Sequence, residues 1–199
     1  MKIFNTTTRL LLNSAACALL LSFSGAALSD PLPSVVDDFS AETDNSLGLP
    51  RQHMNDTVAG GGTSSSVKVK HGVMYLSGDI APPRGQPGWA STVLLLDPQG
   101  KPQSASAYEG IRMRVKINSG NMSVSANSTE ITNFDYHAAP IVVKADGEFH
   151  EVKIPFNKMK RAWSAQTPLN TQTLASVSIT AFDMQKGSYD FAIDEIGFY

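Results

Sequence analysis

Apolar and polar residues alternate along the second half of the chain, which is the pattern of β-strands with one buried face. Successive side chains of a strand point to opposite sides of a sheet. The apolar positions of the clearest segment are Ile111, Met113, Val115 and Ile117. The intervening positions are Arg112, Arg114 and Lys116. This segment therefore predicts a strand whose apolar face lies in a core and whose basic face meets solvent.

Similar segments recur with little helical pattern between them. They are residues 35–39, 67–70, 73–76, 89–97, 122–126, 134–138, 141–143, 152–156, 174–182 and 189–199. His71-Gly72 is the expected turn of a hairpin. Residues 40–66 are polar and predict loops, and Asn157 is expected to cap one helical turn through Lys160. Such spacing predicts an all-β fold, an antiparallel jelly-roll β-sandwich of roughly ten strands.

The last predicted strand contains a break in its alternation. Phe191 and Ile193 would place Glu195 on the buried face, yet the next apolar residues are Ile196 and Phe198. A shift of one residue predicts a β-bulge at Asp194-Glu195, or burial of both faces of the strand.

The N-terminal segment differs from the rest of the chain. Lys2 and Arg9 precede an apolar run over residues 10–23, and small residues follow as far as Ser29. This order predicts a signal peptide over residues 1–29, cleaved after Ser29, and a single domain over residues 30–199. An uncleaved anchor is the alternative, but the run is shorter than the ~20 residues that span a bilayer. We expect an exported protein, periplasmic or secreted, without stable membrane insertion of the mature chain.

Composition narrows the possible partners. The single cysteine, Cys17, lies inside the apolar run, without the leucine three positions earlier that a lipoprotein signal would carry. Cleavage removes two basic side chains and no acidic ones, so the mature domain carries a formal charge of about −4. An acidic domain is a poor partner for nucleic acid or anionic lipid.

Catalytic motifs are not evident. The sequence contains no G-x-S-x-G, and its four histidines (His53, His71, His137 and His150) are scattered. Gly60-Gly61-Gly62 lacks the Lys-Ser/Thr pair of a phosphate-binding loop. The sequence therefore predicts a protein that is not an enzyme.

Acidic residues at the two ends of the domain suggest one metal site. Asp37 and Asp38 lie in the first predicted strand, and Asp194 and Glu195 lie in the last. These strands are often neighbours in jelly rolls, and carboxylate oxygens suit Ca²⁺. Asp38 and Asp194 are the candidate ligands of a structural calcium ion, and solvated strand ends are the alternative.

Aromatic residues suggest a binding face. Tryptophan and tyrosine rings stack on pyranose faces, and Trp163, Tyr136, Tyr108 and Trp89 are the candidates. Trp163 follows a basic, polar stretch and is the best of them, although packing into the core is the alternative. Trp89 opens an apolar strand and is expected in the core. Arg112 and Arg114 are further candidates for contact with a partner.

Several segments together resemble the complex I intermediate-associated protein 30 family. They are Asp37-Asp38-Phe39, Gly88-Trp89-Ala90-Ser91, the block from Tyr108 to Lys116, Ile154-Pro155-Phe156, and the terminal block from Ile193 to Tyr199. The resemblance covers essentially the whole mature chain. It implies a galactose-binding-like jelly roll similar to carbohydrate-binding modules, and a role in protein assembly without catalytic residues. The predicted export signal distinguishes this chain from the family's mitochondrial members. The resemblance therefore predicts the fold of this chain better than its function.

Two functional hypotheses follow. The first is a non-enzymatic module that binds a protein partner, with an assembly or chaperone-like role. The second is a carbohydrate-binding module for a polysaccharide. Sugar binding predicts two or more aromatic side chains exposed on one concave face, whereas an assembly role predicts a broad surface of mixed polarity.

Overall fold

The computed structural model describes residues 31–199, which form one compact unit. The predicted signal peptide lies outside the described residues. The unit contains twelve β-strands and two short 3₁₀-helices. In chain order the strands are β1 (Val35–Asp37), β2 (Gln52–Asn55), β3 (Ser66–Lys70), β4 (Val73–Ile80), β5 (Gly88–Leu95), β6 (Gly110–Ser119), β7 (Asn121–Ser128), β8 (His137–Ile141), β9 (His150–Pro155), β10 (Lys160–Arg161), β11 (Leu174–Asp183) and β12 (Gly187–Phe198). The helices are η1 (Asp56–Ala59) and η2 (Phe156–Lys158).

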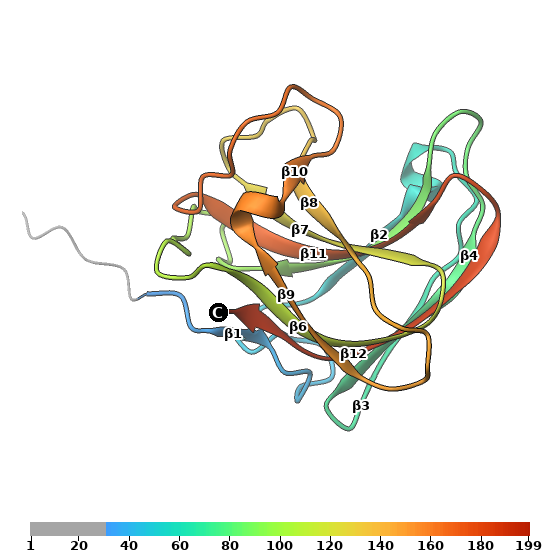
Figure 1. Cartoon of the computed structure of the whole chain (residues 1–199), viewed down its shortest axis with the longest axis horizontal. Helices are drawn as coiled ribbons and strands as arrows, with labels where there is room; N and C mark the ends of the chain where they lie inside the picture. The colour runs from blue at the N-terminus through green and yellow to red at the C-terminus, as the bar shows by residue number, and fades with distance from the viewer. Residues whose placement is uncertain (1–30) are drawn as a thin grey trace, which may run out of the picture. The chain divides into compact units, whose positions relative to one another are not determined.

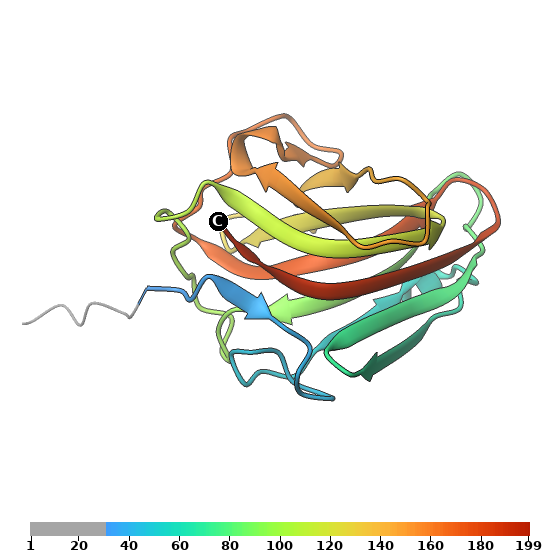
Figure 2. The ribbon, with the colours of Figure 1, turned by 60° about the horizontal axis from the view of Figure 1, so that its bottom comes forward.

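The strands form two antiparallel sheets that pack face to face (Figures 1 and 2). One sheet has the order β3-β4-β12-β6-β9, with β1 also paired to β12, and is called here the β12 sheet. The other has the order β10-β8-β7-β11-β5-β2 and is called the β11 sheet. The all-β sandwich predicted from the alternation is confirmed.

The core lies between the sheets and follows the predicted alternation. The apolar positions of β6 from Ile111 to Ile117 are all buried. The β11 sheet supplies the facing layer, with Val124, Val177 and Ile179 at most 1% exposed. Residues on the outward face of the β11 sheet are therefore free to form a surface of a different chemical character.

The predicted break in β12 is confirmed. The pairing of β12 with β6 changes register between Ile193 and Glu195. Ile193 and Ile196 are both buried, while Asp194 and Glu195 are partly exposed. The bulge thus keeps the core continuous and directs an acidic pair outward.

Turn chemistry accounts for the β3–β4 hairpin. His71 and Gly72 have φ values of 54° and 74°, the left-handed conformation that two-residue hairpin turns require. The predicted hairpin is confirmed. The predicted helical turn begins two residues earlier than expected, because Pro155 rather than Asn157 occupies the N-cap of η2.

Among residues 31–199, no helix has the length and apolar character needed to cross a bilayer.

Candidate functional site

A groove lies on the outward face of the β11 sheet. Its floor consists of small polar side chains that lie side by side on β5, β11 and β7. We call these residues the groove floor: Ser91, Ser123, Ser125, Ser178 and Thr180. Ser91 pairs with Thr180, which pairs with Ser123, and Ser178 pairs with Ser125. Small side chains in adjacent strands leave a depression that a ligand can enter.

The floor presents an ordered set of hydroxyl and amide groups. The Ser91 and Thr180 hydroxyl oxygens lie 3.0 Å apart. The Asn127 side-chain amide donates to the Ser178 hydroxyl at 2.7 Å and to the Ser176 hydroxyl at 2.9 Å. Hydroxyls both donate and accept hydrogen bonds, so each floor residue keeps capacity for a polar ligand.

Aromatic and apolar side chains form the walls of the groove. Trp163 and Phe134 are 60% and 92% exposed, and Tyr136 and Trp89 are half-buried. All four line a volume of about 700 Å³ that also includes Met54. A neighbouring stretch of about 360 Å³ shares Trp89, Tyr136 and Thr180 and continues toward β10. The structure therefore brings together two residues predicted for binding, Trp163 and Tyr136, beside two others.

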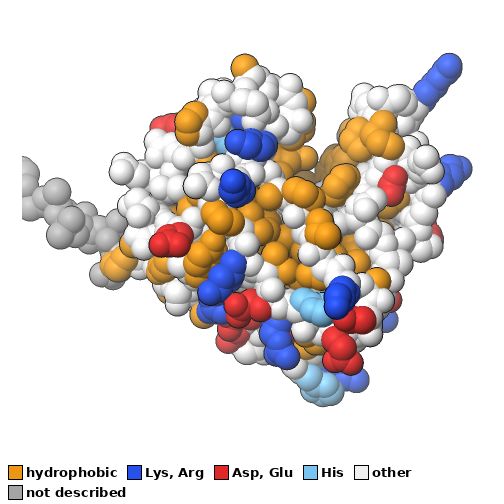
Figure 3. All heavy atoms as spheres, in the orientation of Figure 1, with side chains coloured by type: hydrophobic (Ala, Val, Ile, Leu, Met, Phe, Trp, Pro, Cys, Tyr) orange, Lys and Arg blue, Asp and Glu red, His pale blue; other side chains and the backbone are white. Residues whose placement is uncertain are grey.

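The molecule is hollowed between the two sets of loops that hold these walls. One set is formed by residues 129–136 and 162–173, and the other by η1 and the loop at residues 81–87. The space-filling view shows the notch between them, with hydrophobic side chains at its edges (Figure 3). The groove is thus open to solvent at its mouth.

Asp135 fastens the loop of Tyr136 to the loop of Trp163. Its side chain is fully buried and accepts a hydrogen bond from Arg161 Nε at 2.7 Å. It also accepts from the backbone N–H groups of Tyr136, Ala162 and Ser164, at 2.8 to 3.0 Å. Two of these groups, those of Ala162 and Ser164, flank Trp163, so one carboxylate sets the backbone around both aromatic residues.

These contacts also set the charge of Asp135. Burial alone would raise the pKa of its carboxyl, but the hydrogen bonds from Arg161, Tyr136 and Ser164 outweigh burial and hold the pKa well below its usual range. Burial and the nearby Asp135 charge raise the pKa of the Tyr136 phenol. At neutral pH the carboxylate is ionised and the phenol is uncharged.

A second buried carboxylate supports the opposite wall. Asp56, at the start of η1, is 0% exposed. It accepts hydrogen bonds from the backbone N–H and hydroxyl of Thr63 at 2.9 and 2.6 Å, and from the backbone N–H of Trp89 at 3.1 Å. A Cβ on Gly61 would lie 2.2 Å from the Asp56 side chain, so only glycine fits there. The glycine loop of the sequence is therefore structural.

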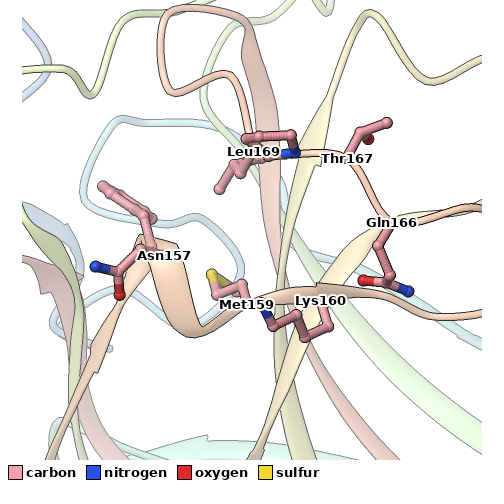
Figure 4. Close-up of a pocket in the computed structure, with 8 residues that line it drawn as sticks. Asn157, Met159, Lys160, Gln166, Thr167 and Leu169 are labelled. Carbon is pink, nitrogen blue, oxygen red and sulfur yellow. The ribbon is translucent and has the colours of Figure 1, made fainter.

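A separate pocket of about 520 Å³ lies between η2 and the loop at residues 166–169. Met159 and Leu169 project into it, and Asn157, Lys160 and Gln166 lie at its border (Figure 4). Its single aromatic residue, Phe156, is only 7% exposed and belongs to the core. This pocket lacks the exposed rings and the hydroxyl floor of the groove.

Arg112 and Arg114 lie on the outward face of the other sheet, away from Trp163 and Tyr136. Each pairs with one member of the acidic bulge, Arg112 with Glu195 and Arg114 with Asp194. The four residues predicted as one binding face thus divide between two sheets, and the arginines already have acidic partners.

The same ion pairs bear on the predicted calcium site. Asp38 and Asp194 do line one small hollow, since β1 pairs with β12 as expected. However, Asp38 accepts hydrogen bonds from Ser40 and Ser46, which lower the pKa of its carboxyl. Residues 31–199 contain no group of three or more His, Cys, Asp or Glu side chains placed to hold a metal ion. The calcium site at Asp38 and Asp194 therefore stays a prediction, with Asp38 bound by two serine hydroxyls and Asp194 paired with Arg114.

One groove residue, Phe134, was not named from the sequence, and another, Trp89, was named as a stacking candidate but expected in the core. Trp89 was predicted to lie in the core, and this is wrong because the buried positions of β5 are Ala90, Thr92 and Leu94. Phe134 has φ 62°, a conformation that bulky residues rarely adopt and that often marks a functional position.

Comparison with solved structures identifies sandwiches of the same fold. The family 11 carbohydrate-binding module of cellulase Lic26A-Cel5E of Clostridium thermocellum superposes with a TM-score of 0.59 at 17% identity, covering 85% of this chain and 95% of that one. The family 11 module from the same organism, in complex with a β-1,3-1,4-mixed-linked tetrasaccharide, gives a TM-score of 0.58 at 17% identity, with coverages of 83% and 94%. An agarase, AgWH50C, gives 0.54 at 8% identity over 83% of this chain and 26% of that chain. At these identities the likeness establishes the fold.

Comparison of the sequence with known families identifies the family of this chain. No curated protein matches the chain. Residues 39–193 match the model of the complex I intermediate-associated protein 30 family, as the resemblance of the separate motifs predicted. The match begins two residues after β1, ends within β12 and includes every strand of the groove. The chain therefore belongs to the complex I intermediate-associated protein 30 family.

Proposed function

We propose that this protein is a non-enzymatic module that binds carbohydrate in the groove of the β11 sheet. The observation that carries the proposal is the gathering of Trp89, Phe134, Tyr136 and Trp163 around a floor of serine and threonine hydroxyls. A pyranose ring has apolar C–H faces and a hydroxyl rim, so it requires both aromatic surface and hydrogen-bonding groups.

The lining of the groove supports binding rather than hydrolysis. Glycoside hydrolysis requires two carboxyl groups that flank the scissile bond. In the described part of the chain, the residues that line the groove and its neighbouring stretch include no Asp or Glu. Asp135 and Asp56 lie behind the walls and are engaged by backbone N–H groups.

The groove also favours a glycan over the protein partner that was the first hypothesis from the sequence. The exposed aromatic residues form a groove rather than a broad flat surface. The arginines proposed for a protein contact are paired within the β12 sheet. We further propose that residues 1–29 direct export, which would bring the module to the polysaccharides outside the cytoplasm.

Affinity electrophoresis of the mature domain in gels that contain polysaccharides tests the proposal. The wild type should be retarded by at least one polysaccharide, and Trp163→Ala should lose most of this retardation. Tyr75→Ala is a matched control, because Tyr75 is a 44% exposed aromatic residue on the β12 sheet. Equal retardation of wild type and Trp163→Ala, or no retardation by any polysaccharide, would contradict the proposal.

A further inference from the structure

The groove is uncharged over most of its length. Among the described residues, those lining the larger volume include no Asp, Glu, Lys, Arg or His. The raised pKa of Tyr136 keeps its phenol neutral as well. An anionic sugar placed here would lose hydration without gaining a cationic partner, and an unpaired buried charge is strongly unfavourable.

Within residues 31–199, the cationic side chains that line the groove are Lys160 and Arg161, both at its β10 end. Arg161 is directed to Asp135 at 2.7 Å and also donates to Asn133 and Thr167. Its charge is therefore neutralised by a carboxylate that the fold supplies. Lys160 is solvent-exposed, and a single exposed lysine contributes little to affinity in salt.

The groove extends across the β11 sheet from β2 to β10. One row of outward-facing positions passes through all six strands by direct pairing: Gln52, Val93, Ser178, Ser125, Ala138 and Lys160. Neighbouring strands lie about 4.8 Å apart, so this row extends for roughly 24 Å. Residues near both ends, Met54 on β2 and Lys160 on β10, line the groove.

We propose that the ligand is an uncharged glycan that lies extended across the six strands of the β11 sheet, in contact with several consecutive sugar units. This inference rests on the proposed function and specifies its ligand. The neutral lining selects against acidic polysaccharides, and the length of the row selects for chains over single sugars. Trp89 and Trp163 contact successive parts of the same chain from opposite walls.

The charge of the ligand is tested by affinity electrophoresis in neutral gels (mixed-linkage β-glucan, xyloglucan, galactomannan, agarose) and in acidic gels (alginate, polygalacturonate), at low and high salt. We expect retardation by a neutral polysaccharide that changes less than about twofold with salt. Lys153→Gln removes an exposed positive charge on β9 of the other sheet, so it is the matched control and should bind as the wild type does. Retardation confined to acidic gels and abolished by salt would overturn this inference while leaving carbohydrate binding in place. Absence of retardation in every gel would instead overturn the proposed function.

The extended geometry is tested with an oligosaccharide series, from disaccharide to hexasaccharide, cut from whichever polysaccharide retards the protein. Tryptophan fluorescence titration should show affinity that rises about tenfold or more from the shortest to the longest member. Met54→Ala should weaken binding of the longest oligosaccharide and leave the disaccharide unaffected, because Met54 lies at the β2 end. Affinity that is already maximal for the disaccharide would overturn the extended geometry.

Discussion

The rings of Tyr136 and Trp163 meet edge to face, with centroids 5.3 Å apart and an interplanar angle of 85°. The two residues belong to different loops, and the Trp163 side chain is 60% exposed. Tyr136 therefore orients the Trp163 indole, which we propose contacts the glycan. The two rings together form one wall of the groove.

The pair should behave as a coupled unit in binding. Tyr136→Leu is expected to weaken glycan affinity roughly tenfold, because an edge-to-face contact contributes about 0.5–1.5 kcal/mol beyond area burial. A double-mutant cycle with Trp163→Ala, measured by titration calorimetry, should give less than the sum of the single effects. Tyr136→Phe keeps the ring and should retain most of the affinity. Additive losses would show that the two rings act independently.

Asp135 should affect both stability and binding. Its side chain is fully buried and paired with the largely buried guanidinium of Arg161, and breaking a buried pair costs roughly 3 kcal/mol or more. Asp135→Asn should lower the melting temperature by about 6–12 °C, measured by calorimetry, and should weaken glycan binding at temperatures where the variant is folded.

Lys153→Gln is the matched control for Asp135→Asn, since its ion pair with Glu151 is solvent-exposed and contributes little. If Asp135→Asn melts lower but binds glycan with unchanged affinity, Asp135 supports the fold without positioning the wall.

Binding should persist in mild acid. The folded-state pKa of Asp135 lies below its unfolded-state value of about 3.9, so the ionised carboxylate stabilises the folded protein fully above that value. This contribution is lost only as the pH falls further, toward the folded-state pKa. Affinity should therefore be constant between about pH 8 and pH 5, measured by fluorescence titration. A decrease near pH 6 would point to a histidine that contacts the ligand.

Replacing Phe134 should have opposite effects on the stability of the protein and on its affinity for glycan. An aromatic residue at φ 62° carries backbone strain of about 1 kcal/mol. Because the ring of Phe134 is 92% exposed, its packing offsets little of this strain. Phe134→Asn should maintain or raise the unfolding free energy, because asparagine tolerates the left-handed region, yet should weaken glycan binding. Phe134→Ile should be destabilised. A loss of stability in Phe134→Asn would show that the ring supports the loop.

The buried pair Arg51–Asp37 should affect stability alone. Arg51 donates to both carboxylate oxygens of Asp37, at 2.6 and 2.9 Å, and also to the carbonyl oxygens of Ala41 and Glu42. Arg51→Lys loses this planar geometry and should cost roughly 3 kcal/mol of unfolding free energy in urea titrations. The folded variant should bind glycan as the wild type does. A large loss of affinity would show that the residues before β2 shape the groove.

Strands with a regular alternation could be predicted from the sequence, and strands without one could not. The β6 segment places four apolar residues on one face, and all four are buried. By contrast, β2 is a polar edge strand, Gln52–Asn55, with no buried residue. It forms through backbone pairing with β5, which leaves no periodic signal, so residues 40–66 were predicted to be loops.

The groove could be predicted only in part. Trp163 was expected to be exposed because its neighbours are polar, and it is. Its contact with Tyr136 depends on the hydrogen bonds that Asp135 accepts. Their donors include the backbone N–H groups of Tyr136 and Ser164, which lie far apart in the sequence. Trp89 was assigned to the core because its strand is apolar. In the structure, the alternate residues Gly88 and Ala90 face the core, so Trp89 points outward. Glycine and alanine are weakly hydrophobic, so the sequence did not indicate which face of β5 would be buried.

The row of residues that crosses the β11 sheet has a consequence for folding. It joins Gln52 to Val93, Val93 to Ser178, Ser178 to Ser125 and, at its far end, Ala138 to Lys160. These pairings close long loops, whose entropic cost must be met before the contacts form. No contiguous fragment of the chain contains the whole row unless it extends from β2 to β11. We therefore expect the proposed ligand binding to require the assembled sheet and to be lost when any one of these strands is removed.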